Sequence, residues 1–179
     1  TEIFYDGEKP ISFLEVDGAK EVGIEFHSLS KTYNMTGWRI GFAAGSSSLI
    51  QGLGKIKTNL DSGIFQAIQE AGIEALRGDQ SSVERMRALY QERRDTFVAG
   101  LRDAGLSCDP PRATFYLWMQ VPRGYTSRTF CEFLLKKAGI AATPGNGFGK
   151  SGEGYIRFTL TVSRERLAEA AERIKKVLC

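Results

Sequence analysis

Lys31 and Arg39 lie eight positions apart in a stretch rich in hydroxyl side chains and glycine. Ser28 and Ser30 come just before the lysine. A primary amine can form a Schiff base with a carbonyl group, and a guanidinium can hold a phosphate through two charge-assisted hydrogen bonds. These groups together predict a site for a phosphorylated carbonyl compound. A lone lysine would most simply be a solvated loop residue, but that interpretation leaves the fixed spacing of the arginine and the glycines unexplained.

Arg157 is the second residue of interest, because its neighbours in 155–160 are mostly aromatic or aliphatic. Burying an unpaired guanidinium is costly, and its planar fork suits a carboxylate. The pattern therefore predicts either a site for a carboxylate ligand or a structural ion pair with an acidic neighbour.

The first half of the chain must position Lys31 and Arg39. Apolar and polar residues alternate over 22–27, which predicts a strand, and the polar segment that follows is expected to be a loop as far as Gly37. Residues 1–20 are expected to be irregular. The further expected elements are a strand at 38–44 and helices at about 46–57 and 64–77, the second ended by Gly78.

The second half must position Arg157. A long helix is expected from about 82 to 104, with its charged residues, Arg94 among them, on a solvated face. The elements expected after Pro110 are a buried strand at 114–121, a helix at 127–138, a strand at 140–143, a loop at 144–147, a strand at 155–160 and a helix from Ser163 to 178. The sequence thus predicts the α/β class, with one unit at 1–80 and a second at 81–179.

Composition narrows the function classes. The chain has 179 residues, of which 42% are hydrophobic and 25% charged, as in ordinary globular proteins. The net charge of +3 comes from dispersed basic residues, so neither nucleic acid nor a membrane is indicated as a partner. No apolar run is long enough for a membrane span. Cys108, Cys131 and Cys179 lack metal-ligand spacing, which predicts no metal site and free thiols in a cytoplasmic protein.

Residues 28–41 resemble the signature of the class I/II aminotransferases, enzymes of fold type I that use pyridoxal 5′-phosphate (PLP). The matching pattern is small-x-small-Lys-x-x-small-hydrophobic-x-Gly-x-Arg-hydrophobic-Gly. The resemblance implies that Lys31 forms the Schiff base with PLP and moves the substrate proton. It also implies that Ser28 and Arg39, with Ser30 as a further candidate, bind the cofactor, and that Arg157 binds the substrate α-carboxylate.

The resemblance also implies an architecture. Residues 1–80 would be the C-terminal portion of the PLP-binding large domain, and 81–179 the small C-terminal α/β domain. The family's glycine-rich phosphate loop, its stacking aromatic residue and the Asp that keeps the cofactor ring protonated would precede Thr1. The 179 residues alone are therefore expected to be an inactive fragment, or nearly so, of a homodimeric enzyme.

The substrate pair stays open among several alternatives. Residues 25–41 and 57–69 are similar to the bacterial LL-diaminopimelate aminotransferases, which implies amino-group exchange between glutamate and tetrahydrodipicolinate in lysine biosynthesis. Alanine- and aspartate-type aminotransferases share the lysine loop. A PLP lyase, and a PLP-sensing aminotransferase-like domain of a transcription regulator, are the remaining alternatives.

Three other features have simpler interpretations. His27, the only histidine, is expected to pack or hydrogen-bond rather than act as a base. The cluster from Phe115 to Trp118 is expected to be core. The segment from Asp61 to Gly63 is a candidate for approaching the neighbouring subunit's site, because the family's sites form at a dimer interface.

Overall fold

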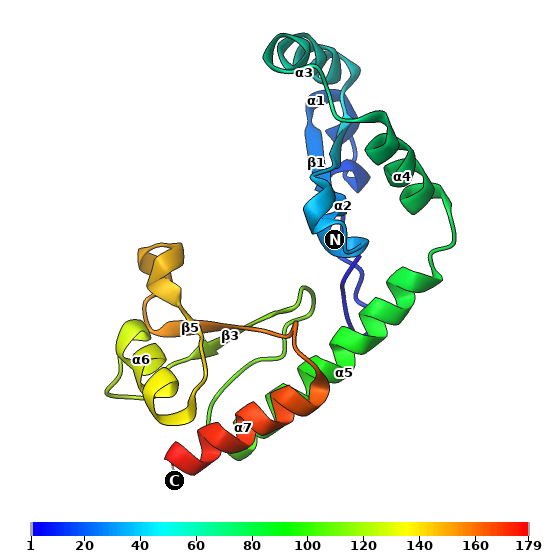
Figure 1. Ribbon diagram of the computed structural model, residues 1–179. Coiled ribbons are helices and arrows are strands. Elements are labelled where there is room, and N and C mark those ends of the chain that lie inside the picture. The colour runs from blue at the N-terminus through cyan, green and yellow to red at the C-terminus, as the bar shows by residue number, and fades with distance from the viewer. Residues whose placement is uncertain (1, 179) are drawn as a thin grey trace. The chain divides into compact units, whose positions relative to one another are not determined.

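The computed structural model describes residues 2–178 and divides into two compact units, one up to Met86 and one from Arg87 onwards. Helix α5 (Ser81–Asp103) begins in the first unit and ends in the second (Figure 1). That the two units are the domains predicted from the sequence, 1–80 and 81–179, stays a prediction. Within residues 2–178, no helix combines the length and the apolar character that crossing a bilayer requires.

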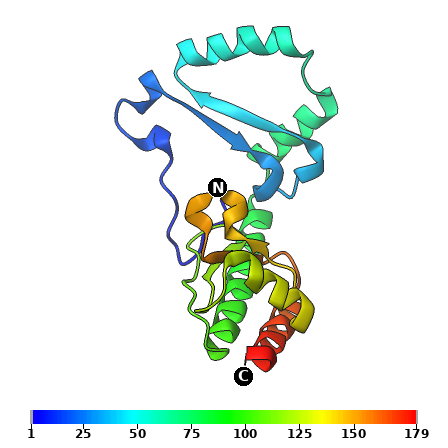
Figure 2. The same ribbon diagram turned by 90° about the vertical axis from the view of Figure 1, so that its left-hand side faces the viewer.

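The first unit is built on a two-stranded antiparallel sheet, in which β1 (Ile24–Ser28) pairs with β2 (Gly41–Gly45). Figure 2 shows the two strands side by side. The connection between them contains the short helices α2 (Leu29–Thr32) and η2 (Thr36–Trp38). The remaining elements are η1 (Phe13–Glu15), α1 (Ala19–Val22), α3 (Ser47–Leu60) and α4 (Gln66–Arg77).

Several boundaries of this unit differ from the sequence predictions. The strand expected at 22–27 begins later, because Val22 completes α1. The expected loop at 28–37 is partly helical, because the Ser28 side chain caps α2. The strand expected from residue 38 starts at Gly41, because Trp38 belongs to η2. Helix α4 ends before Gly78, as predicted.

The second unit contains a three-stranded antiparallel sheet in the order β3 (Tyr116–Gln120), β5 (Tyr155–Thr159), β4 (Thr143–Pro144). Its helices are α6 (Ser127–Ala138) and α7 (Arg164–Leu178), with the short turns η3 (Gly145–Phe148) and η4 (Lys150–Gly152) before β5. One face of the sheet is core: Leu117, Met119 and Ile156 are fully buried, and Phe158 meets Phe97 of α5 edge-on at 5.2 Å.

The opposite face of this sheet is open, so the strand predicted as buried is only half buried. Trp118 is 40% exposed and Tyr155 is 41% exposed. The expected core cluster at 115–118 therefore holds for Phe115 and Leu117 but is wrong for Trp118. The strand expected at 140–143 is also shifted, because the Ile140 amide donates to the Leu134 carbonyl in the C-terminal turn of α6.

Arg94 is buried, which contradicts its assignment to a solvated helix face. Its Nη1 donates to the Pro111 carbonyl at 3.2 Å and its Nε donates to the Asp95 carboxylate at 2.8 Å. The guanidinium thus anchors the loop after α5, a tertiary role that its position on the helix does not reveal. Among the cysteines, Cys108 is buried and Cys131 half-buried, both as free thiols, and Cys179 lies outside the described residues.

Helices α5 and α7 pack in parallel at one glycine. Arg164 pairs with Glu92 near the start of α7, and Lys175 pairs with Asp103 near its end. Between these pairs, a Cβ on Gly100 would lie 2.5 Å from the Ala171 Cβ. The close approach of the helices therefore depends on glycine at this position.

We expect Gly100→Ala to lower the free energy of unfolding of the second unit by about 1–3 kcal/mol, because the added methyl overpacks the α5–α7 contact. Gly54→Ala in α3 is the opposite control: its Cβ meets open space, so it should stabilise by about 0.5–1 kcal/mol. Each unit contains one tryptophan, Trp38 or Trp118. Denaturant unfolding followed by tryptophan fluorescence measures both effects. Trp118 reports on Gly100→Ala when Trp38 is changed to Phe, and Trp38 reports on Gly54→Ala when Trp118 is changed to Phe. Equal destabilisation by both variants would contradict the packing argument.

Candidate functional site

Ser28 ends β1 and begins the helix that carries Lys31. Its Oγ accepts a hydrogen bond from the Ser30 amide at 3.2 Å, which is the capping interaction of α2. Ser30 is buried, whereas Lys31 is exposed on the same turn. The cap therefore fixes the position of the Lys31 backbone directly after β1.

Thr36 connects this turn to Arg39. The Thr36 hydroxyl donates to the Ser30 carbonyl at 3.0 Å, and the Thr36 carbonyl accepts from Arg39 Nη1 at 3.0 Å. Arg39 has a left-handed backbone, with φ of 54°, a conformation that is uncommon for residues other than glycine. The serine, the threonine and the arginine thus form one hydrogen-bonded chain around the lysine turn. Sequence reasoning missed Thr36, which the family signature leaves undefined.

A close backbone contact holds the other end of the connection. The Leu29 amide donates to the Ile40 carbonyl at 3.2 Å, and a Cβ on Gly41 would lie 2.4 Å from the His27 carbonyl oxygen. Only glycine fits there without moving β1. The connection between the strands is therefore pinned on both sides of Lys31.

His27 makes the packing and polar contacts predicted for it. Its ring stacks on Phe42 with centroids 4.9 Å apart, and its Nε2 lies 3.4 Å from Glu25 Oε1. A hydrogen bond from the Ser12 hydroxyl is the main cause that lowers the pKa of the Glu25 carboxyl. These contacts tie the segment around η1 to β1.

Arg157 is held between two aromatic rings. The guanidinium carbon lies 4.1 Å from the Tyr116 ring centroid and 4.2 Å from that of Phe148. Cation–π contacts fix the guanidinium plane through its faces and leave the N–H donors at its edge available. Among residues 2–178, Arg157 forms no ion pair. Sequence reasoning did not identify the two rings.

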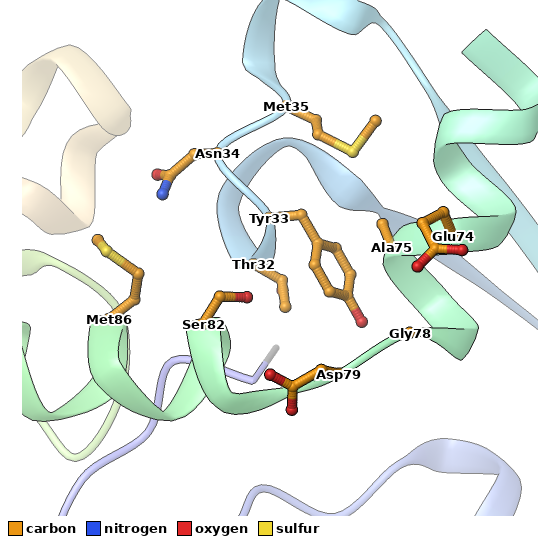
Figure 3. Close-up of a pocket in the computed structure, with 10 residues that line it drawn as sticks. All are labelled: Thr32, Tyr33, Asn34, Met35, Glu74, Ala75, Gly78, Asp79, Ser82 and Met86. Carbon is orange, nitrogen blue, oxygen red and sulfur yellow. The ribbon is translucent and has the colours of Figure 1, made fainter. Parts of the chain in front are cut away.

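A pocket of about 400 Å³ lies between the segment after Lys31 and the junction of α4 with α5. Figure 3 shows the Tyr33 ring in this pocket, directed toward that junction. The Tyr33 hydroxyl donates to Gln80 Oε1 at 3.0 Å, and burial raises the pKa of the phenol. None of the predicted site residues lines the pocket, and nothing in the sequence had indicated it.

The structure groups four of the five predicted site residues. Ser28 is the last residue of β1, and Ser30, Lys31 and Arg39 lie in the connection that follows it to β2, all in the first unit. Arg157 belongs to β5 in the second unit.

The spacing of Lys31, Arg39 and the glycines around them predicts membership of the class I/II aminotransferases. The profile of the family described as Aminotransferase class I and II matches residues 2–174. The chain belongs to this family. The family membership predicted from residues 28–41 is thereby confirmed, whereas the roles of the individual residues stay predictions.

Individual class I/II aminotransferases are similar along nearly the whole chain. The LL-diaminopimelate aminotransferase of Syntrophobacter fumaroxidans is 57% identical over 177 residues, which cover 99% of this chain and 46% of that protein. The aromatic aminotransferase from Pyrococcus horikoshii superposes with a TM-score of 0.93 at 37% identity, covering 99% of this chain and 48% of that one. A probable N-succinyldiaminopimelate aminotransferase from Thermus thermophilus gives a TM-score of 0.91 at 39% identity, covering 98% and 47%.

These matches confirm the predicted α/β class. The chain spans about half the length of the curated relatives that it matches. Cofactor, substrates and assembly of the whole protein therefore belong to the proposal that follows.

Proposed function

We propose that this chain supplies the cofactor lysine and the carboxylate-binding arginine of a PLP-dependent aminotransferase. The observation that carries the proposal is Lys31 on the capped turn after β1, linked through Thr36 to Arg39, in a class I/II aminotransferase chain. Residues 1–80 would belong to the large domain and 81–179 to the small domain. The chain would be the C-terminal part of the enzyme.

The residues of the turn fit a phosphorylated aldehyde. Arg39 is exposed, and its hydrogen bond to the Thr36 carbonyl uses a single Nη1–H of the five donors on a guanidinium. The Ser28 oxygen accepts from the Ser30 amide, which leaves its own O–H to donate. Together with the Ser30 hydroxyl, these donors lie on the segment that carries the exposed Lys31.

The roles of the residues follow from this arrangement. PLP, when bound, withdraws electrons from the substrate α-carbon. The Lys31 amine takes the proton from the substrate α-carbon and delivers it to the cofactor, as a positioned general base does. Ser28, Ser30 and Arg39 hold the phosphate, and Arg157 orients the substrate through its α-carboxylate.

LL-diaminopimelate and 2-oxoglutarate are the substrates that we propose, with glutamate and tetrahydrodipicolinate on the other side of the exchange. The support is the name shared by relatives that are 54–57% identical. Those names favour transamination over a PLP lyase or a PLP-sensing regulator. We further propose a cytoplasmic homodimer, in which the segment from Asp61 to Gly63 approaches the partner subunit's site.

The decisive test is covalent labelling of a protein of the relatives' full length that contains these residues. Titration with PLP should give a new absorbance band, and borohydride should fix the cofactor to Lys31, as peptide mapping would show. Lys31→Ala should lose the fixed label, whereas Lys55→Ala, at an exposed position of α3, should keep it. Labelling at another lysine would overturn the assignment.

We expect Thr36→Val to weaken PLP binding about tenfold, because it removes a hydrogen bond worth about 0.5–1.5 kcal/mol and loosens the carbonyl that holds Arg39. Fluorescence titration with PLP measures the dissociation constant. Thr58→Val is the matched control, since the Thr58 hydroxyl donates to carbonyls of its own helix. Unchanged affinity in Thr36→Val would show that the threonine does not position the arginine.

A further inference from the structure

Ser127 is a fully buried serine at the start of α6, outside the groups assigned so far. Its Oγ accepts hydrogen bonds from the Gly154 amide at 2.9 Å and the Tyr155 amide at 3.2 Å. The same hydroxyl donates to the Gly152 carbonyl at 3.4 Å. One donor and two acceptors are all that a hydroxyl offers, so this side chain is committed to the turn that precedes β5.

Glu153 makes the reciprocal bond from that turn to α6. Its Oε1 accepts from the Ser127 amide at 2.8 Å. This bond is the main cause that lowers the pKa of the Glu153 carboxyl, and the Asn146 side chain in η3 adds a smaller contribution. Serine and glutamate thus join the first turn of α6 to both η3 and the turn before β5.

The segment that these two residues hold is also tightly packed on itself. A Cβ on Gly145 would lie 2.1 Å from the Gly152 carbonyl oxygen, and a Cβ on Gly152 would lie 2.1 Å from that of Gly145. The segment carries Phe148, whose ring covers the Arg157 guanidinium and meets Trp118 edge-on at 5.4 Å. It then continues directly into the strand that contains Arg157.

We propose that Ser127 and Glu153 are positioning residues for Arg157. They fix the turn so that Phe148 and Tyr116 hold the guanidinium plane with its donor edge ready for a carboxylate. The inference rests on the proposed function, because it assumes that Arg157 binds the substrate α-carboxylate. In this role both residues act through Arg157 and need no contact with the substrate.

The proposal predicts a loss confined to carboxylate recognition. Ser127→Ala leaves the Gly154 and Tyr155 amides without their acceptor, so the turn shifts and Phe148 no longer confines the arginine. In the full-length protein, KM for the amino-acid substrate should rise about tenfold, the effect of losing one good charge-assisted contact. PLP affinity should stay unchanged. Single-turnover reaction with a primary amine that lacks a carboxylate should also keep its rate.

Three further variants separate positioning from general damage. Glu153→Leu should raise KM as Ser127→Ala does, whereas Glu153→Gln keeps an oxygen acceptor for the Ser127 amide and should stay near wild type. Ser163→Ala is the matched control, because Ser163 caps α7 through the Arg166 amide. Its loss should lower stability without changing KM. In an Arg157→Ala background, Ser127→Ala should have no further effect on KM.

The outcomes are distinguishable. An active wild type whose KM is unchanged by Ser127→Ala, or an equal loss with the amine that lacks a carboxylate, overturns the positioning role. A wild type that neither binds PLP nor transfers amino groups overturns the proposed function, and the inference with it. A rise in KM restricted to carboxylate substrates, absent in Glu153→Gln and Ser163→Ala, supports the positioning role.

Discussion

Lys31→Ala should lower the transamination rate of the full-length protein by at least about 10²–10⁴-fold, the range over which a positioned general base acts. The reason is that alanine removes the amine that receives the substrate proton, while the capping bond of Ser28 and the Thr36 link use other atoms. Binding of the amino acid should therefore persist while turnover is lost. Pre-steady-state absorbance, with glutamate as the amino donor, separates the two steps.

Two controls identify the origin of this loss. Lys55→Ala, elsewhere in the same unit, should leave turnover unchanged. Small primary amines added to Lys31→Ala should restore part of the rate, because they can act as bases in the vacated space. Full activity in Lys31→Ala would remove this lysine from the mechanism and leave the family membership intact.

The sequence predicted those elements whose ends are determined locally. Helix α6 was expected at 127–138 and is found there, because Thr126 caps its start and Gly139 adopts the left-handed conformation at its end. Helix α7 likewise follows Ser163 as expected. In such helices the apolar spacing and the cap agree, so no distant contact is needed to place them.

The prediction failed where a distant contact decides the structure. Arg94 follows Arg93 on a strongly charged helix, yet the Pro111 carbonyl draws its guanidinium into the interior. One face of the three-stranded sheet is open. A run of apolar residues does not show whether one or both faces of a strand are covered. The apolar run around Trp118 therefore predicts a core residue, whereas the residue is 40% exposed.

The same distinction between local and distant contacts applies to the residues of the candidate site. The signature named Lys31, Ser28 and Arg39 because their spacing is local to one connection. It gave no indication of Tyr116 and Phe148, which reach Arg157 from separate segments through strand pairing and a glycine-rich turn. Residues that act by holding another side chain leave a weaker pattern in the sequence than residues that perform the chemistry.

Arg157→Ala should raise KM for the amino-acid substrate by about 10²–10⁴-fold in the full-length protein. Two charge-assisted bonds to a carboxylate contribute about 1.5–3 kcal/mol each, and that range of binding energy corresponds to this change in affinity. Arg157→Lys should recover little of the loss, because an ammonium lacks the planar fork and cannot lie flat between the Tyr116 and Phe148 rings. Steady-state kinetics with glutamate give both values.

The alternative explanation, a general effect of removing a positive charge, has a direct test. Arg128→Ala removes an arginine of α6 whose side chain is 79% exposed and pairs with Glu132. Exposed pairs of this kind contribute about 0–1 kcal/mol, so this variant should keep the wild-type KM. Amines without a carboxylate should react equally well with wild type and Arg157→Ala. If instead their rates fell in parallel with those of amino acids, the arginine would serve the fold of the sheet, and its aromatic clamp would be a packing device rather than a substrate anchor.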